Sequence, residues 1–93
     1  MIQSFEDRDT ELIFSGQRSK RFPNDIHKRA LTKLLMLDAA ESELDLRSPP
    51  ANHLEKLKGD RRSESSIRIN RQWRICFRFE NGNAYDVGIE DYH

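Results

Sequence analysis

The last third of the chain alternates apolar and polar residues with a period of two, and this pattern constrains the fold most strongly. It runs through "SSIRIN" at 65–70, "QWRICFRF" at 72–79 and "AYDVGIED" at 84–91. Successive side chains of a β-strand point to opposite faces of a sheet, so the alternation predicts three strands, each with one apolar face. The Asn-Gly pair at 81–82 favours a tight hairpin, and the short gaps between the segments predict antiparallel pairing.

The same alternation predicts which side chains share a face of the sheet. The core face would carry the odd-numbered apolar residues of these strands, which are Ile67, Ile69, Trp73, Ile75, Phe77, Phe79, Tyr85, Val87 and Ile89. One face of an antiparallel sheet can remain in water. We therefore expect Arg68, Arg74, Arg78 and Tyr92 to form an exposed cationic patch on the opposite face. An alternative for Arg68 is a cross-strand ion pair with an acidic residue, Asp86 or Glu90.

The first half of the chain predicts two helices. "DTELIFSG" at 9–16 is a short amphipathic segment that ends in a glycine, and "NDIHKRALTKLLMLDAAESELDL" at 24–46 repeats apolar residues at three- and four-residue steps. "MIQSF" at 1–5 is a short strand candidate, and Pro49-Pro50 excludes a long helix in the loop that follows. The chain length fits a single domain over residues 1–93. The prediction is an α+β fold, with two N-terminal helices packed on one face of a small, mostly antiparallel sheet.

Composition excludes several classes of protein. The longest apolar run, "LLML" at 34–37, is far short of the roughly 20 residues that span a bilayer. A lone cysteine, Cys76, excludes an internal disulfide and is typical of a reducing compartment; it fits a small, buried side chain. The three histidines are too widely separated to suggest metal ligation. We therefore expect a cytoplasmic protein with no membrane segment, metal or cofactor.

The formal net charge of zero conceals a segregation along the sequence. Residues 53–78 carry eight Lys or Arg against three acidic residues, whereas residues 79–93 carry four acidic residues and no Lys or Arg. The overall balance argues against indiscriminate coating of nucleic acid, while the middle third can attract phosphate locally. A solvated charged face would produce the same composition.

Three motifs resemble a known family. "LEKLKGDR", "SIRINRQWRICFRF" and "NAYDVGIEDYH" resemble the HigB toxins of bacterial type II toxin–antitoxin modules, within the RelE/ParE superfamily. The resemblance covers the whole chain and is densest over residues 49–93. It implies a RelE-like ribonuclease fold and a ribosome-dependent endonuclease that cuts messenger RNA on the 70S ribosome. It also implies a HigA-like helix-turn-helix antitoxin, through which the toxin would associate indirectly with operator DNA.

The implied reaction is metal-independent: a ribose 2′-hydroxyl attacks the adjacent phosphate and leaves a cyclic phosphate. It needs a base, cations for the developing charge and an acid for the leaving oxygen. The terminal "DYH" can supply proton transfer. His93 is the best candidate because imidazole titrates nearest pH 7. Asp91 could act as base or orient that ring, and Tyr92 could donate a hydrogen bond or stack on a base. A frayed polar tail is the structural alternative.

The resemblance also assigns cations. Arg74, Arg68 and Lys58 would stabilise the phosphorane charge, with Arg74 offering a two-pronged guanidinium to phosphate. A second set would contact messenger or ribosomal RNA, namely Lys56, His53, Arg61, Arg62, Arg71 and Arg78. Two of these depart from the family pattern. Some relatives place a histidine just ahead of "LKGD", near but not at the position of His53, and many carry an acid where this chain has Arg71.

Two other functions are compatible with the sequence. ParE-like members of the superfamily bind and inhibit DNA gyrase without nuclease chemistry. A catalytically inactive module would only bind an antitoxin and, through it, operator DNA. The polar ending and the clustered Arg and Lys favour the ribonuclease.

Overall fold

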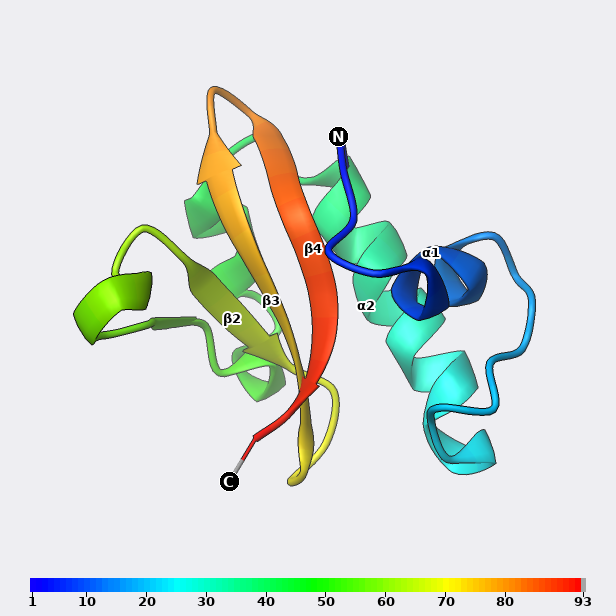
Figure 1. The fold of residues 1–93 in the computed structure, drawn as a ribbon. Coiled ribbons are helices and arrows are strands. Elements are labelled where there is room, and N and C mark those ends of the chain that lie inside the picture. Colours follow the sequence, from blue (N-terminus) through cyan, green and yellow to red (C-terminus); the bar gives the residue numbers. More distant parts are fainter. Residues whose placement is uncertain (93) are drawn as a thin grey trace.

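The computed structural model describes residues 1–92, in which two α-helices pack against one face of a four-stranded antiparallel sheet (Figure 1). The helices are α1 (Arg8–Phe14) and α2 (His27–Ala39), and the strands are β1 (Glu55–Lys56), β2 (Ser65–Arg68), β3 (Trp73–Glu80) and β4 (Asn83–Asp91). The strands lie in the order β1-β2-β3-β4. The α+β fold is thus confirmed, and β1 is a short edge strand that the sequence did not predict.

The predicted helix over 24–46 is wrong in its extent, because the chain forms three separate segments there. A 3-10 turn, η1 (Asn24–Ile26), precedes α2, and a second, η2 (Glu43–Arg47), follows it. The break comes at Ala40, which adopts an extended conformation. Asp45 then accepts hydrogen bonds from the backbone N–H groups of Glu41 and Ser42, which lowers the pKa of its carboxyl. Such side-chain bonds compete with helix continuation.

The first helix and the N-terminal segment also differ in detail from the prediction. Helix α1 begins one residue earlier than expected because Asp7 caps it, accepting a hydrogen bond from the Thr10 N–H at 2.7 Å. The "MIQSF" segment runs beside β4 through isolated parallel bridges, Ile2 to Ala84 and Phe5 to Val87. It therefore extends the sheet only locally.

The core lies between α2 and the sheet. Leu34 and Leu37 of α2 are fully buried against Ile67, Ile75 and Ile89, which come from three neighbouring strands. Ile75 pairs directly with both of the other isoleucines across the sheet. The odd-numbered core face is confirmed over this part of the sheet, and burial of these branched side chains stabilises the fold.

The predicted hairpin is present, but a bulge in β4 changes the facing of one residue. Asn81 and Gly82 both have positive φ values of 50° and 80°, as a type I′ turn requires. The register then shifts between Cys76 and Arg78, and Asp86 opposite them has a φ of 54°. This bulge turns Tyr85 away from the core, so its predicted place on the core face is wrong.

Two further 3-10 turns shape the surface near the site. They are η3 (Pro50–Asn52), which precedes β1, and η4 (Gly59–Arg61), which separates β1 from β2. Within residues 1–92, no helix is long and apolar enough to cross a membrane.

Candidate functional site

Arg74 is buried, with only 1% of its surface exposed, so its predicted exposure on an open sheet face is wrong. Its Nε donates to Ser66 Oγ at 2.8 Å, and its Nη2 donates to the carbonyl oxygens of Ser66 (3.2 Å) and His53 (2.5 Å). The end of η3, at His53, therefore contacts the buried Arg74 from the outer side of the sheet. None of the three bonds uses Nη1.

Tyr92 lies on the outer side of Arg74. The guanidinium carbon of Arg74 is 4.9 Å from the centroid of the Tyr92 ring, within cation–π range. The Tyr92 hydroxyl donates to Glu55 Oε2 at 3.1 Å, and its backbone N–H donates to the Gln72 carbonyl at 2.6 Å. These three contacts hold the chain through Tyr92, which excludes fraying of that residue. Tyr92 as a whole is 43% exposed, so it is accessible to a ligand.

Glu55 is a candidate functional residue that the sequence analysis missed. Its carboxylate accepts the Tyr92 hydrogen bond, and this bond together with the negative charge raises the pKa of the Tyr92 phenol. Glu55 lies on β1, 37 positions before Tyr92, so no local pattern relates the two residues. The one available signal was its place just ahead of "LKGD", where some relatives have a histidine.

Asp91 ends β4 opposite Trp73, and its carboxylate accepts a hydrogen bond from Gln72 Nε2 at 3.1 Å. His93, the predicted proton-transfer residue, lies outside the described residues, and its role remains a prediction from the sequence.

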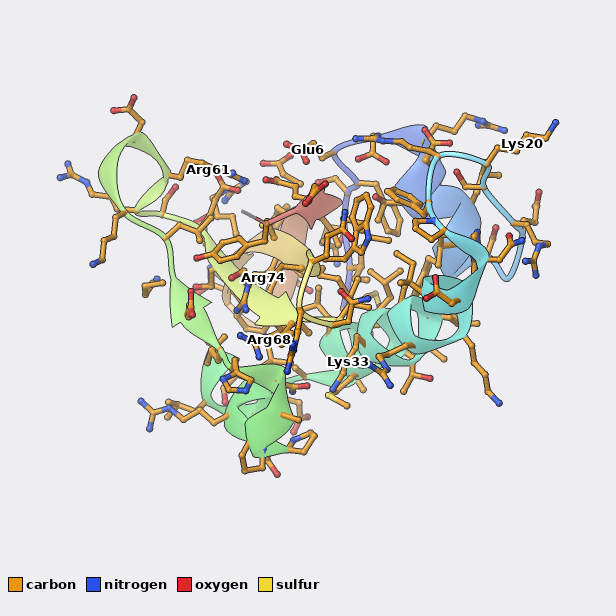
Figure 2. The ribbon with its side chains drawn as sticks, turned by 90° about the horizontal axis from the view of Figure 1, so that it is seen from below. Glu6, Lys20, Lys33, Arg61, Arg68 and Arg74 are labelled. Carbon is orange, nitrogen blue, oxygen red and sulfur yellow. The ribbon has the colours of Figure 1, made fainter. Side chains whose placement is uncertain are left out.

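Arg68 lies directly opposite Arg74 on the neighbouring strand. Like charges directly opposite each other in a sheet are unfavourable, whereas on its other side Arg74 lies directly opposite the carboxylate residue Glu90 of β4. The alternative of a cross-strand ion pair for Arg68 is wrong. Glu90 binds Arg61 at 2.7 Å, and Asp86 lies 3.8 Å from Arg78. Figure 2 shows Arg68 and Arg74 side by side.

Arg61 and Arg78 do not join this cluster. Arg61 binds both Glu90 and Glu64, and its hydrogen bonds lower the pKa of Glu90. Arg78 forms an ion pair with Glu80 and packs over the Tyr85 ring. Arg78 is four residues along β3 from Arg74, a separation of about 13 Å at the usual strand rise. Carboxylates neutralise both cations, and the single predicted patch is therefore two separate groups.

Three more of the predicted cations, Lys56, Lys58 and Arg62, lie on β1 and on the exposed segment that follows it. Lys56, on β1, is 3.9 Å from a carboxylate oxygen of Glu43. Lys58 immediately precedes η4, and Arg62 immediately follows it; both are exposed. Cys76, as expected, is a buried free thiol, and burial raises its pKa to about 12.

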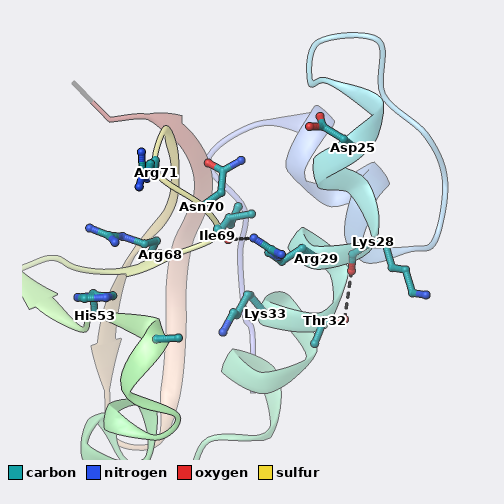
Figure 3. A pocket seen from close by; sticks show the side chains of 11 residues that line it. Asp25, Lys28, Arg29, Thr32, Lys33, His53, Arg68, Ile69, Asn70 and Arg71 are labelled. Carbon is teal, nitrogen blue, oxygen red and sulfur yellow. Dashed lines mark hydrogen bonds between the residues drawn. The ribbon is translucent and has the colours of Figure 1, made fainter.

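A cleft of about 840 Å³ lies between α2 and the loop that joins β2 to β3. Three predicted residues line it: His53, Arg68 and Arg71. Figure 3 shows them across the opening from α2. The α2 side contributes the basic residues Lys28, Arg29 and Lys33, which were not predicted as site residues from the sequence. These cations lie between the repeated apolar residues of the helix, and this spacing could have identified them as a basic surface. Among residues 1–92, no three His, Cys, Asp or Glu side chains gather in an arrangement that could hold a metal ion.

Comparison with known proteins gives consistent results. A model of the family described as RelE-like toxins of the type II toxin–antitoxin system HigB matches residues 3–93. A Vibrio cholerae protein named Toxin HigB-1 is 34% identical over 93 residues, covering 99% of this chain and 98% of the relative. A Proteus vulgaris protein named Endoribonuclease HigB is 36% identical over 93 residues, covering all of both chains. An uncharacterised Haemophilus influenzae protein is 36% identical over 77 residues, covering 83% of this chain and 76% of the relative.

Proposed function

Because the chain belongs to the RelE-like HigB toxins of type II toxin–antitoxin systems, we propose that it is an endoribonuclease that cuts messenger RNA on the ribosome. The Proteus relative is named an endoribonuclease. The observation that carries the proposal is the contact series Arg74–Tyr92–Glu55, which joins a guanidinium, an exposed aromatic ring and a carboxylate at one place.

Each member of this series has a use in RNA cleavage. The buried guanidinium of Arg74 would stabilise, through its positive charge, the negative charge that develops at the scissile phosphate. The exposed face of the Tyr92 ring would stack on an unpaired base. Arg68, directly opposite Arg74, and Lys58, on the neighbouring exposed segment, would add positive charge at the same phosphate.

The proposed reaction needs no metal. The carboxylate of Glu55 takes the proton from the ribose 2′-hydroxyl, and the 2′-oxygen attacks phosphorus. The bond from phosphorus to the 5′-oxygen breaks, and this oxygen takes a proton from an acid, for which His93 is the sequence-based candidate. The products are a 2′,3′-cyclic phosphate and a 5′-hydroxyl. The hydrogen bond from Tyr92 keeps Glu55 oriented toward the site.

The ribosome would present the substrate. A chain with a formal net charge of zero cannot hold free RNA strongly through electrostatics alone, since affinity for nucleic acid grows with the number of neutralised phosphates. We therefore infer that translated message is cut and that free RNA is a poor substrate. A type II module supplies a cognate antitoxin, and we propose a HigA-like helix-turn-helix protein in that role, which would link the toxin to operator DNA.

The test compares translated and untranslated transcripts incubated with the purified chain, with the new 5′ ends mapped. We expect cuts confined to reading frames and a loss of about 10²-fold or more in rate for Tyr92→Ala, which removes both the ring and the hydroxyl. Tyr85→Ala is the matched control, since Tyr85 also packs on an arginine but at the bulge. Intact message together with inhibition of DNA gyrase would refute the proposal and favour the ParE-like alternative.

A further inference from the structure

The cleft beside α2 is unusually rich in unpaired positive charge. Five Lys or Arg side chains and His53 line it, against a single carboxylate, Asp25. Within residues 1–92, no ion pair joins any of the five cations to a carboxylate. Arg61 and Arg78, elsewhere on the sheet, are both paired with acids. The positive charge in the cleft is therefore available to an external anion.

Hydrogen bonds to uncharged oxygen atoms hold two basic side chains of α2 in place on the wall of the cleft. Arg29 Nη1 donates to the Ile69 carbonyl at 3.4 Å, and Lys33 donates to the side-chain oxygen of Asn52. Arg29 and Lys33 are one helical turn apart, where like charges repel. Burial and the nearby Arg29 lower the pKa of Lys33. The folded protein thus holds two like charges together and points both into the opening (Figure 3).

The cleft is continuous with the Arg74 site. Arg68 lines the cleft and also lies directly opposite Arg74. His53 lines the cleft, and its backbone carbonyl binds the Arg74 guanidinium. An RNA strand with one phosphate at Arg68, beside the buried Arg74, could therefore continue along the cleft and remain next to positive charge.

Acidic residues make the opposite direction unfavourable for RNA. On the β4 side, Glu90 lies directly opposite Arg74 and binds Arg61 together with Glu64. Burial and the negative charge of Glu90 raise the pKa of the Glu6 carboxyl. A second, smaller hollow there is lined by Glu6, Glu64 and Asp86 with Arg78. Backbone phosphates would be repelled by these carboxylates. The charge distribution therefore favours a single direction of exit from the site.

From these observations we propose that the cleft binds the backbone phosphates of the RNA strand that flanks the scissile phosphate. This rests on the proposed ribonuclease function and specifies how its substrate is held. No Phe, Tyr or Trp is among the residues that line the cleft, and His53 is its one ring. Five cations line the cleft beside that one ring, so contacts to phosphate, which carry no base sequence, dominate its recognition of RNA. Stacking is left to Tyr92.

Binding of an uncleavable 2′-O-methyl RNA strand tests the proposal without any need for catalysis. The double variant Arg29→Gln/Lys33→Gln removes two cations, and Arg18→Gln/Lys20→Gln removes two exposed cations of the loop before α2 as the matched control. Figure 2 shows Lys20 well separated from Lys33. Losing two phosphate contacts should lower the slope of log affinity against log salt by about 1.4 and the affinity by about 25-fold at about 0.1 M salt. The control should bind like the parent chain.

Thermal melts establish that each variant is folded, and Arg71→Gln, an exposed residue of the opposite wall, provides a second route if the α2 variant does not fold. It should lower the slope by about 0.7. An unchanged slope in the folded cleft variants, or no measurable binding by the parent chain, would overturn the proposal. The proposal would also be overturned if removing these cations weakened the binding of a polyglutamate peptide and left the binding of RNA unchanged. That result would assign the cleft to an acidic protein partner. Normal binding with no cleavage of translated message would instead contradict the ribonuclease function alone.

Discussion

The guanidinium carbon of Arg74 lies 4.9 Å from the centroid of the Tyr92 ring, so a buried side chain of the sheet supports an exposed ring near the end of the chain. Arg74 therefore has two roles that a mutation can separate, one in stability and one in the site. Arg74→Lys should lower the free energy of unfolding by about 2 kcal/mol, because lysine cannot reproduce the bonds to Ser66 and the His53 carbonyl in a buried setting.

Urea denaturation measures this effect. Arg62→Lys serves as the control because Arg62 is exposed, and surface substitutions usually change stability by less than about 0.5 kcal/mol. Equal stabilities for the two variants would show that the hydrogen bonds of Arg74 contribute little.

The contact between Tyr92 and Glu55 predicts a specific titration. The Glu55 carboxylate raises the pKa of the Tyr92 phenol above its ordinary value of 10.0, because it accepts the hydroxyl hydrogen bond and repels the phenolate. Glu55→Gln should move this pKa back toward 10.0, so that phenolate forms at lower pH. Ultraviolet absorbance follows the ionisation, and Tyr92→Phe identifies which of the two tyrosines is responsible. A titration that Glu55→Gln leaves unchanged would contradict the contact.

The same Glu55→Gln substitution should lower the rate of message cleavage by about 10²-fold or more if Glu55 is the base, since general bases typically contribute about 10²–10⁴-fold. Glu80→Gln is the control, as Glu80 lies at the far end of β3. Full activity in Glu55→Gln would assign the proton transfer to another group, with Asp91 and His93 the sequence-based candidates.

Acid stability should depend on Arg61. Its hydrogen bonds lower the pKa of Glu90 below the ordinary value of 4.5 in the folded chain. The stabilisation is therefore present above about pH 4.5 and is lost as the pH falls through the lower folded value. Arg61→Gln should remove part of this pH dependence, about 0.5–1 kcal/mol because both side chains are partly exposed. Arg62→Gln should not, and identical acid unfolding curves for the two variants would count against the ion pair.

Cys76 should resist alkylation in the folded chain. Burial raises the pKa of its thiol from 9.0 to about 12, which lowers the reactive thiolate fraction about a thousandfold at about pH 8. Iodoacetamide labelling of native and urea-unfolded protein, followed by mass spectrometry, measures the ratio of rates. Comparable rates would place the thiol at the surface.

Periodicity predicted the part of the fold that depends on local spacing. Ile67, Ile75 and Ile89 occupy the core face that alternation assigned to them. Tyr85 does not, because a bulge at Asp86 shifts the parity of β4, and a one-residue irregularity leaves no clear mark in an alternating sequence. The overlong helix had a similar cause. Its apolar spacing continued past Ala40, while a side-chain bond to Asp45 ended the helix.

The site depended on contacts between distant positions, which explains its partial prediction. Tyr92 and Arg74 were identified and lie together, but the burial of Arg74 follows from a carbonyl 21 positions earlier in the chain. Glu55 and the α2 cations were missed for the same reason. Arg61 and Arg78 belong to the predicted basic segment, yet acids brought close by the sheet neutralise them.

The burial of Arg74 also determines how a phosphate would be received. A flexible arginine gives up about 2 kcal/mol of rotamer entropy when a ligand immobilises it. Folding has already removed that freedom from Arg74 through Ser66 and His53. A correctly placed phosphate therefore lies near a fixed positive charge, whereas a displaced phosphate finds that the buried guanidinium cannot move toward it. This rigidity makes binding depend on where the RNA backbone lies, and it does not by itself make binding tight.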